Sequence, residues 1–298
     1  MNKLLVILGP TASGKTSLAV KLARLFNGEI ISADSRQVYK GMDIGTGKDL
    51  AEYGKGKNKI PYHLIDVVKP MTEFNAGKFK RSAERAIDDI ISRNKLPILA
   101  GGTGLYISSI VDNYQFPKGK PDKLVRKKVA TMTLKRKLNL LKKLDLATYK
   151  KIDKINDRRV DRALEVCLQG QKFSSSAKKP AKYNILQLGL KFPKNVLDKR
   201  IDQRVDERLD EGMIAEVKRL HKNGTTWRRL ENFGLEYRHV AQYLQKKLDK
   251  DEMTHLLKIA IHQFAKRQMT WFKRDSRINW VKNFTEAKKL TNKFLKSS

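Results

Sequence analysis

The segment 9–16 constrains the fold of this chain more than any other part of its sequence. It follows the apolar run 4–8, precedes an amphipathic stretch, and reads Gly9-Pro10-Thr11-Ala12-Ser13-Gly14-Lys15-Thr16. In a G-x-x-x-x-G-K-T spacing, glycines let backbone N–H groups approach phosphate oxygens, and the N-terminus of the next helix adds positive potential. Lys15 is expected at an outer phosphate and the Thr16 hydroxyl at Mg²⁺. The sequence therefore predicts a phosphate-binding loop between a buried strand and a helix.

Enzymes with this loop usually hold Mg²⁺ with a second carboxylate at the end of a later strand. The strand expected at 96–100 runs into Gly101 with no Asp or Glu at its end, whereas the strand expected at 29–33 is followed directly by Asp34. Ligands bind outside the carboxyl ends of parallel strands, so we expect Asp34 near the loop. The residues leave three roles open for it, which are metal ligand, general base and N-cap of a following helix.

The charge balance narrows the class of partner. Lys and Arg number 64 and Asp and Glu 31, which gives a formal net charge of +33 on 298 residues. Such a surplus favours polyanionic partners, with adaptation for solubility as the alternative. Basic residues gather at 158–162, where a helix is expected to begin, and at Lys266 and Arg267 on the polar side of a helix expected over 253–274. Each cluster alone could be a solvated face, but together with the phosphate loop they favour a nucleic-acid surface.

Strand and helix patterns alternate from the N-terminus to about residue 112, which is typical of a parallel sheet. The pattern breaks at 116–121, a Lys- and Leu-rich helical stretch follows, and a strand expected at 185–190 returns to the sheet. We therefore expect an α/β fold with a P-loop NTPase-like parallel sheet, helices on both faces and an inserted all-helical domain. The catalytic core would comprise 1–115 and 183–298, its C-terminal part largely helical, and the insertion 116–182.

Apolar residues at helical spacing predict one long helix from Leu197 to about Asn223, where Asn-Gly is a stop signal. Arg200 and Arg204 are four residues apart on this helix, so both could reach one anion, with pairing to nearby carboxylates as the alternative. The one cysteine, Cys167, excludes an internal disulfide and is expected as a small core residue. No apolar run is long enough for a membrane span, so we expect a cytoplasmic protein with no membrane partner.

Further motifs follow the phosphate loop along nearly the whole chain. They are Ile31-Ser32-Ala33-Asp34-Ser35-Arg36-Gln37-Val38-Tyr39-Lys40-Gly41-Met42-Asp43-Ile44-Gly45-Thr46, Gly101-Gly102-Thr103-Gly104-Leu105-Tyr106, Arg162-Ala163-Leu164-Glu165-Val166, Arg200-Ile201-Asp202-Gln203-Arg204-Val205 and Ala265-Lys266-Arg267-Gln268-Met269-Thr270-Trp271-Phe272. In this order, the set resembles the bacterial tRNA dimethylallyltransferases, also called tRNA isopentenyl transferases.

The resemblance implies that the loop residues 9–16 hold the diphosphate of dimethylallyl diphosphate instead of a nucleotide. The prenyl group would pass to N6 of adenosine 37, just 3′ of the anticodon. Asp34 would accept a proton from the adenine amine or hydrogen-bond to it, while Lys15, Arg204 and Thr16 with Mg²⁺ would stabilise the departing diphosphate. Thr11 and Thr103 would complete the site. No γ-phosphate is cleaved in this chemistry, which would account for the missing second carboxylate.

The resemblance also implies that the partner is the anticodon stem-loop of tRNA, that no protein partner is obligatory, and that the helical insertion contacts the tRNA. The implied tRNA-binding residues are Asp34, Ser35, Arg36, Gln37, Thr103, Arg126, Arg158, Arg159, Val160, Asp161, Arg162, Ile261, His262, Gln263, Phe264, Ala265, Lys266, Arg267 and Gln268.

Two other functions share part of these features. An adenylate isopentenyltransferase, which prenylates AMP, ADP or ATP, shares the loop and Asp34, but a mononucleotide acceptor has no need of the helical insertion and the basic segments. A kinase or a nucleoside-triphosphate-driven RNA-binding protein would also use the loop, and it predicts ATP hydrolysis and a separate metal carboxylate.

Overall fold

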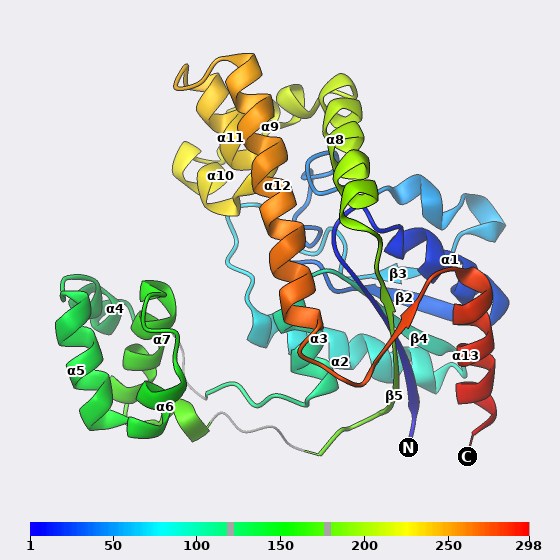
Figure 1. Cartoon of the computed structure of the whole chain (residues 1–298), viewed down its shortest axis with the longest axis horizontal. Coiled ribbons are helices and arrows are strands. Elements are labelled where there is room, and N and C mark those ends of the chain that lie inside the picture. Colours follow the sequence, from blue (N-terminus) through cyan, green and yellow to red (C-terminus); the bar gives the residue numbers. More distant parts are fainter. Residues whose placement is uncertain (118–121, 176–179, 298) are drawn as a thin grey trace. The chain divides into compact units, whose positions relative to one another are not determined.

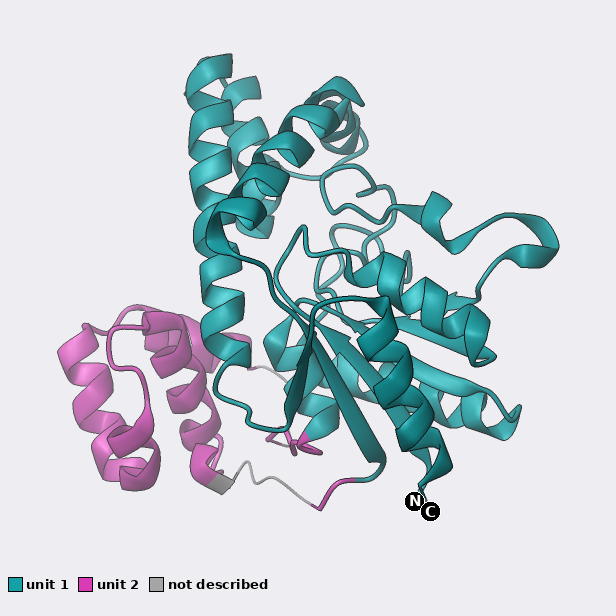
Figure 2. Cartoon of the chain, turned by 45° about the vertical axis from the view of Figure 1, so that its right-hand side comes forward, with its two compact units in different colours: residues 1–111, 182–298 teal, residues 112–181 magenta. Residues whose placement is uncertain are grey.

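The computed structural model describes residues 1–117, 122–175 and 180–297 (Figure 1). The chain forms two compact units, one made of Met1–Val111 with Lys182–Ser298 and the other of Asp112–Ala181 (Figure 2). The insertion expected at 116–182 begins four residues after the second unit and ends one residue beyond it.

A parallel six-stranded sheet lies at the centre of the first unit, in the order β3-β2-β4-β1-β5-β6. The strands are β1 (Lys3–Leu8), β2 (Gly28–Ser32), β3 (Tyr62–His63), β4 (Leu96–Gly101), β5 (Asn184–Leu190) and β6 (Ile278–Val281). The predicted parallel sheet is confirmed, including the return of β5 to pair with β1. The edge strands β3 and β6 were not predicted, because runs of two and four residues are too short for a periodic signal.

Helices cover both faces of this sheet, as predicted. Alternate residues of β1 face opposite sides, so Leu4 and Val6 join one core cluster while Leu5 and Ile7 join another. The first cluster includes residues of α2 (Ala76–Ser92) and α3 (Gly104–Val111), and the second includes residues of α1 (Lys15–Leu25) and α13 (Phe284–Lys296). Because both of its faces are covered, β1 reads as a continuous apolar run.

A helical layer of the same unit follows β5 and carries its own apolar core. Its helices are α8 (Lys194–Asp210), α9 (Met213–Lys222), α10 (Trp227–Phe233), α11 (Leu235–Leu244) and α12 (Lys250–Phe272). The prediction of one helix from Leu197 to Asn223 is wrong, because the chain breaks at Gly212 into α8 and α9. Gly212 has φ +98°, a backbone conformation that glycine tolerates best, and the apolar spacing continues across the break.

The second unit is helical in its described residues. It contains α4 (Lys123–Ala130), α5 (Leu134–Leu144), α6 (Leu146–Lys151) and α7 (Asp157–Leu168), followed by the short 3₁₀ segment η3 (Phe173–Ser175). Among the described residues of the first unit, the 3₁₀ segments are η1 (Leu50–Tyr53) and η2 (Gly56–Asn58). Leu141, Val160 and Leu164 form its core together with Cys167, which is buried as expected. Among the helices of the described ranges, none combines the length and the apolar character that crossing a bilayer requires.

The stacked pair Phe79 and Tyr106 joins α2 to α3, with ring centroids 4.0 Å apart. Phe79 is fully buried, so Phe79→Ala leaves a cavity that the helices cannot close. We expect the free energy of unfolding to fall by about 3–5 kcal/mol, measured by urea denaturation. Met71→Ala, at a side chain that is 53% exposed, is the control and should change it by less than about 0.5 kcal/mol. Equal effects of the two substitutions would contradict this packing.

Candidate active site

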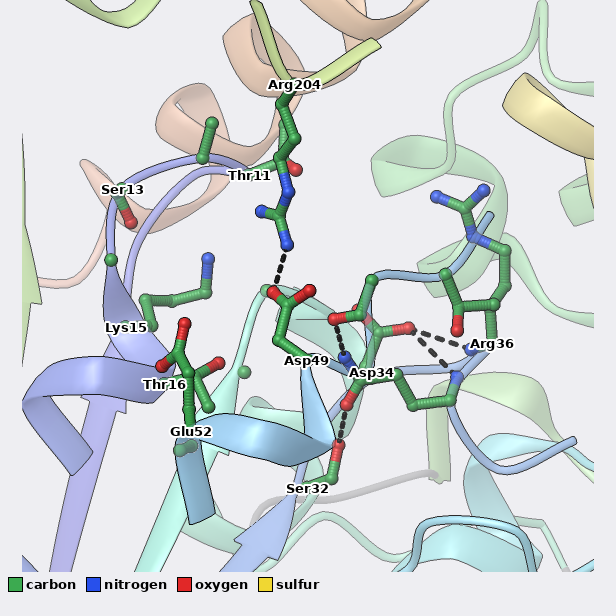
Figure 3. Close-up of a pocket in the computed structure, with 18 of the residues that line it drawn as sticks. Thr11, Ser13, Lys15, Thr16, Ser32, Asp34, Arg36, Asp49, Glu52 and Arg204 are labelled. Atoms are coloured by element: carbon green, nitrogen blue, oxygen red, sulfur yellow. Dashed lines mark hydrogen bonds and ion pairs between the residues drawn. The ribbon is translucent and has the colours of Figure 1, made fainter. Parts of the chain in front are cut away.

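A polar pocket of about 460 Å³ lies within the first unit, at the carboxyl ends of the strands (Figure 3). Its lining combines residues of the phosphate loop with residues that follow β2, that end β4 and that project from α8 and α12. The register places Leu8 of β1 opposite Gly101 of β4, so the loop starts beside the end of β4. This is the edge at which open parallel sheets bind ligands.

The phosphate loop has the backbone that its sequence predicts. Gly14 adopts φ +74° immediately before α1, and the Ser13 hydroxyl donates a hydrogen bond to the Pro10 carbonyl oxygen at 2.8 Å. A Cβ at Gly9 would lie 2.8 Å from the carbonyl oxygen of Leu190, so only glycine lets the loop pass this close to β5. Helix α1 begins at Lys15 and therefore directs its free N–H groups toward the pocket.

Lys15 is the central cation of the pocket. Its Nζ atom donates to the Pro10 carbonyl oxygen at 2.5 Å, so the side chain folds back over the loop. Burial and the neighbouring Arg204 lower the pKa of Lys15 to about 8, an effect that the Asp34 carboxylate partly offsets. A bound anion would raise this pKa again, because its negative charge stabilises the protonated ammonium.

Asp34 lies just beyond β2 and lines the same pocket. Its Oδ1 atom accepts hydrogen bonds from the N–H groups of Arg36 (2.8 Å) and Gln37 (3.4 Å). Residues 35–38 form a turn, so the N-cap interpretation of Asp34 is wrong: the side chain caps a turn and no helix follows. The Thr103 hydroxyl accepts the N–H of Ser35 at 3.0 Å, which ties this turn to the end of β4.

Two further carboxylates, Asp49 and Glu52, line the pocket. They come from the loop between β2 and β3, at and just after the start of η1, and the search for acidic residues at strand ends missed them. Asp49 forms an ion pair with Arg204, and burial together with Asp49 raises the pKa of Glu52. Further carboxylates thus reach the pocket from a loop, which no strand pattern could indicate.

The oxygen donors of the pocket fit a Mg²⁺ ion that is shared with a substrate. The Thr16 hydroxyl lines the pocket together with the Asp49 and Glu52 carboxylates. Within the described residues, no group of three or more acidic, His or Cys side chains is arranged to hold a metal alone. Mg²⁺ is commonly bound through one or two carboxylates, water and substrate phosphates, so this donor set fits such a shared ion.

Three arginines of α8 approach the pocket. Arg204 is held by Asp49, and the Arg200 guanidinium lies 4.2 Å from the centre of the Phe192 ring. Both side chains line the pocket, and their binding of one anion stays a prediction. Arg208, which the sequence analysis did not select, is buried and pairs with Glu236 at 3.3 Å; burial and Arg204 lower its pKa.

The residues expected to bind tRNA along α12 divide into two groups. Ile261 and Ala265 are core residues, so their side chains hold the helix in place and do not reach a ligand. Lys266, Arg267 and Gln263 are exposed, while His262 lies 2.9 Å from Asp202. Phe264 lines the pocket, where the Arg36 guanidinium lies 5.7 Å from its ring centre.

Gln268 of α12 lines the pocket and also joins two parts of its wall. Its side chain is nearly buried, with Oε1 accepting the N–H of Thr11 at 2.8 Å and Nε2 donating to the Gly102 carbonyl oxygen at 2.9 Å. It therefore joins the phosphate loop to the end of β4. Such a role has no signal in the sequence, because it depends on contacts between residues more than 150 positions apart.

In the second unit, the implied tRNA-binding residues lie on or beside α7. Arg158 and Arg159 are exposed on its first turn, and Val160 is buried in the core. Arg126 and Arg162 both pair with the buried carboxylate of Glu165, and Asp161 lies 2.6 Å from Lys137. Arg158 and Arg159 are therefore exposed at the start of α7, where a polyanion could reach them.

A phosphate loop that shares one pocket with a carboxylate beyond the next strand and with arginines defines a P-loop-type enzyme acting on a phosphorylated donor. The IPP transferase family model matches residues 37–275. The tRNA dimethylallyltransferase 2 of Shewanella sediminis is 45% identical over 93% of this chain and 92% of its own length, and the tRNA dimethylallyltransferase 1 of Syntrophus aciditrophicus is 44% identical over 94% of both. The chain belongs to the IPP transferase family and is a prenyltransferase.

Two solved structures agree with this assignment. The tRNA delta(2)-isopentenylpyrophosphate transferase of Staphylococcus epidermidis has a TM-score of 0.72, with 33% identity and full coverage of both chains. A eukaryotic dimethylallyltransferase acting on tRNA has a TM-score of 0.77, with 28% identity over 96% of this chain and 75% of its own. The family resemblance and the P-loop-type α/β fold expected from the sequence are thereby confirmed.

The lowered pKa of Lys15 predicts that donor affinity depends on pH. The protonated ammonium binds the diphosphate, so affinity is highest well below pH 8 and falls as pH rises through the pKa of the free enzyme, about 8. Between pH 7.5 and 9.5 we expect the Kd for dimethylallyl diphosphate, measured calorimetrically without tRNA, to rise about tenfold or more.

Lys15→Met is the control for this measurement. It removes the titrating group, so its Kd should be weak throughout and nearly constant between pH 7.5 and 9.5. Parallel pH profiles of wild type and Lys15→Met would show that another group controls binding.

Proposed function

We propose that this chain transfers the dimethylallyl group of dimethylallyl diphosphate to N6 of adenosine 37, 3′ of the anticodon in tRNA, and releases diphosphate. The observation that supports this most directly is that Lys15 of the phosphate loop and the Asp34 carboxylate line one pocket, close enough for Asp34 to raise the pKa of Lys15. In this proposal Lys15 binds the diphosphate and Asp34 accepts the proton within the same pocket.

Asp34 acts on the acceptor in this proposal. In the reaction, the bond from prenyl C1 to the diphosphate oxygen breaks, the bond from C1 to N6 forms, and one N6 proton leaves. The backbone N–H groups of Arg36 and Gln37 fix the Asp34 carboxylate through Oδ1, so the group is oriented before the amine arrives. It accepts the hydrogen bond of the exocyclic amine and then its proton.

The phosphate loop and α8 act on the leaving group. Lys15, the free N–H groups at the start of α1 and Arg204 surround the space where negative charge develops as the C1–O bond breaks. Thr16 together with Asp49 or Glu52 would hold Mg²⁺, which supplies further positive charge to the diphosphate. Arg204 is already oriented by Asp49, so little reorganisation is needed when the donor binds.

The acceptor is positioned by exposed basic side chains. Lys266 and Arg267 on α12, and Arg158 and Arg159 on α7, are exposed and suited to phosphate contacts. Because N6 is not accessible to a pocket while the base remains stacked, adenosine 37 must turn out of the anticodon stack. Phe264, in the pocket beside Arg36, offers an aromatic surface for an unstacked base.

Transfer of label from dimethylallyl diphosphate tests the function. With Mg²⁺ and unmodified tRNA, label should appear as N6-dimethylallyladenosine, and Asp34→Asn should lower turnover by about 10²–10⁴-fold because the base is lost. The Asn side chain retains the oxygen that caps the turn, so the Kd for tRNA should stay within about twofold of wild type. Near-normal turnover of Asp34→Asn would remove Asp34 from the mechanism, and label in AMP or ATP alone would favour an adenylate isopentenyltransferase.

Lys266→Ala tests the α12 surface. The substitution removes one cation from an exposed position, so the slope of log K against log salt concentration should flatten by about one unit if Lys266 neutralises one phosphate. Lys288→Ala on α13, an exposed lysine on a helix that packs against the opposite face of the sheet from α3, is the matched control and should leave the slope unchanged. Equal salt-dependence slopes for the two variants would show that Lys266 does not neutralise a tRNA phosphate.

A further inference from the structure

Glu216 of α9 holds a loop of the active site without lining the pocket itself. Its side chain is buried, with the residue 3% exposed. Its Oε2 atom accepts the N–H groups of Asp43 and Ile44, both at 2.8 Å, and its Oε1 atom accepts the N–H of Gly45 at 3.1 Å. The Tyr237 hydroxyl donates to Oε1 at 2.8 Å. Three consecutive backbone donors thus converge on one carboxylate.

Lys48 and Gly45 also fix the same loop. Lys48 is 1% exposed, and its Nζ atom donates to the Tyr39 carbonyl oxygen at 2.8 Å and to the Asp43 carboxylate at 2.7 Å. Gly45 lies directly on the Tyr237 ring, because a Cβ there would be 2.8 Å from Cζ. Buried contacts therefore hold the loop 43–49 on two sides, and Glu216 accepts the N–H groups of three of its consecutive residues.

The end of this loop meets the arginines of the pocket. Gly47 has φ +58°, and a Cβ at this position would lie 1.7 Å from Nη2 of Arg208 and 2.6 Å from Nη2 of Arg204. Two residues later, Asp49 forms its ion pair with Arg204. The backbone at Gly47 and the carboxylate of Asp49 thus define where the Arg204 guanidinium can lie.

We propose that Glu216 is a positioning residue of the donor site: it fixes the loop 43–49, and through Gly47 and Asp49 this loop sets Arg204 for the diphosphate. The proposal rests on the proposed function, in which Arg204 meets the leaving group. Only a group with acceptors alone fits this place, because an amide nitrogen would point a donor at another donor. The helical layer behind α8 therefore helps to determine donor affinity as well as fold stability.

Glu216→Gln tests this role while preserving side-chain shape. We expect the Kd for inorganic diphosphate with Mg²⁺ to rise about tenfold, the KM for dimethylallyl diphosphate to rise similarly, and the Kd for tRNA to stay within about twofold. Glu29→Gln is the matched control: Glu29 is 2% exposed, holds Arg93, Lys95 and His63, and lies at the amino end of β2, away from the pocket. It should lower stability and leave the Kd for diphosphate unchanged.

A double-mutant cycle separates positioning from general destabilisation. If Glu216 acts through Asp49, adding Glu216→Gln to Asp49→Asn should change the Kd for diphosphate by less than about twofold. The proposal would be overturned if the effects of Glu216→Gln and Asp49→Asn on the Kd for diphosphate multiply in the double mutant. It would also be overturned if Glu216→Gln and Glu29→Gln weaken diphosphate binding equally.

Should Glu216→Gln fail to fold, Tyr237→Phe offers a second test, because it removes one donor to Oε1. This variant should raise the Kd for diphosphate by a smaller factor of about two to four, and an unchanged Kd would count against the proposal. If the cycle holds but wild type transfers no prenyl group, the positioning role stands and the proposed function fails.

Discussion

The site depends on a cation that burial and a neighbouring cation hold in an unfavourable state. Lys15 and Arg204 line the same pocket, and burial together with Arg204 lowers the pKa of Lys15. The start of α1 and the loop backbone, which packs closely against β5, hold Lys15 where a bound anion would stabilise its charged form. Binding of a diphosphate and stabilisation of a departing diphosphate are then consequences of one electrostatic arrangement.

The sheet and the helical layer contribute different parts of that arrangement. The sheet places Asp34 beyond the carboxyl end of β2 and the phosphate loop beyond that of β1, on either side of β4, which fixes the distance between the two groups. The helical layer supplies Arg204 and Gln268, of which Gln268 joins the loop to β4. Glu216 belongs to the same layer and acts on the site through a loop. Residues that look structural in a burial profile can therefore influence donor binding.

The features that could be predicted from the sequence are those that depend on short-range residue patterns. The loop 9–16, the buried strands and the separate helical segment have strong short-range patterns, and the structure contains all of them. The prediction of one long helix was wrong at Gly212, because an apolar spacing can continue across a turn that one glycine makes. Asp49, Glu52 and Arg208 were missed because they reach the pocket only when a loop folds against α8, and the two hydrogen bonds of Gln268 were missed because its partners are distant in sequence. The roles of the exposed basic residues stay predictions.

The central claim is that this phosphate loop serves a prenyl diphosphate and not a nucleotide. Calorimetric titration of the wild-type protein with dimethylallyl diphosphate and, separately, with ATP, both with Mg²⁺, tests it most directly. The account predicts binding of dimethylallyl diphosphate at least tenfold tighter than that of ATP, with no ATP hydrolysis on prolonged incubation. Tighter binding of ATP, accompanied by its hydrolysis, would contradict it.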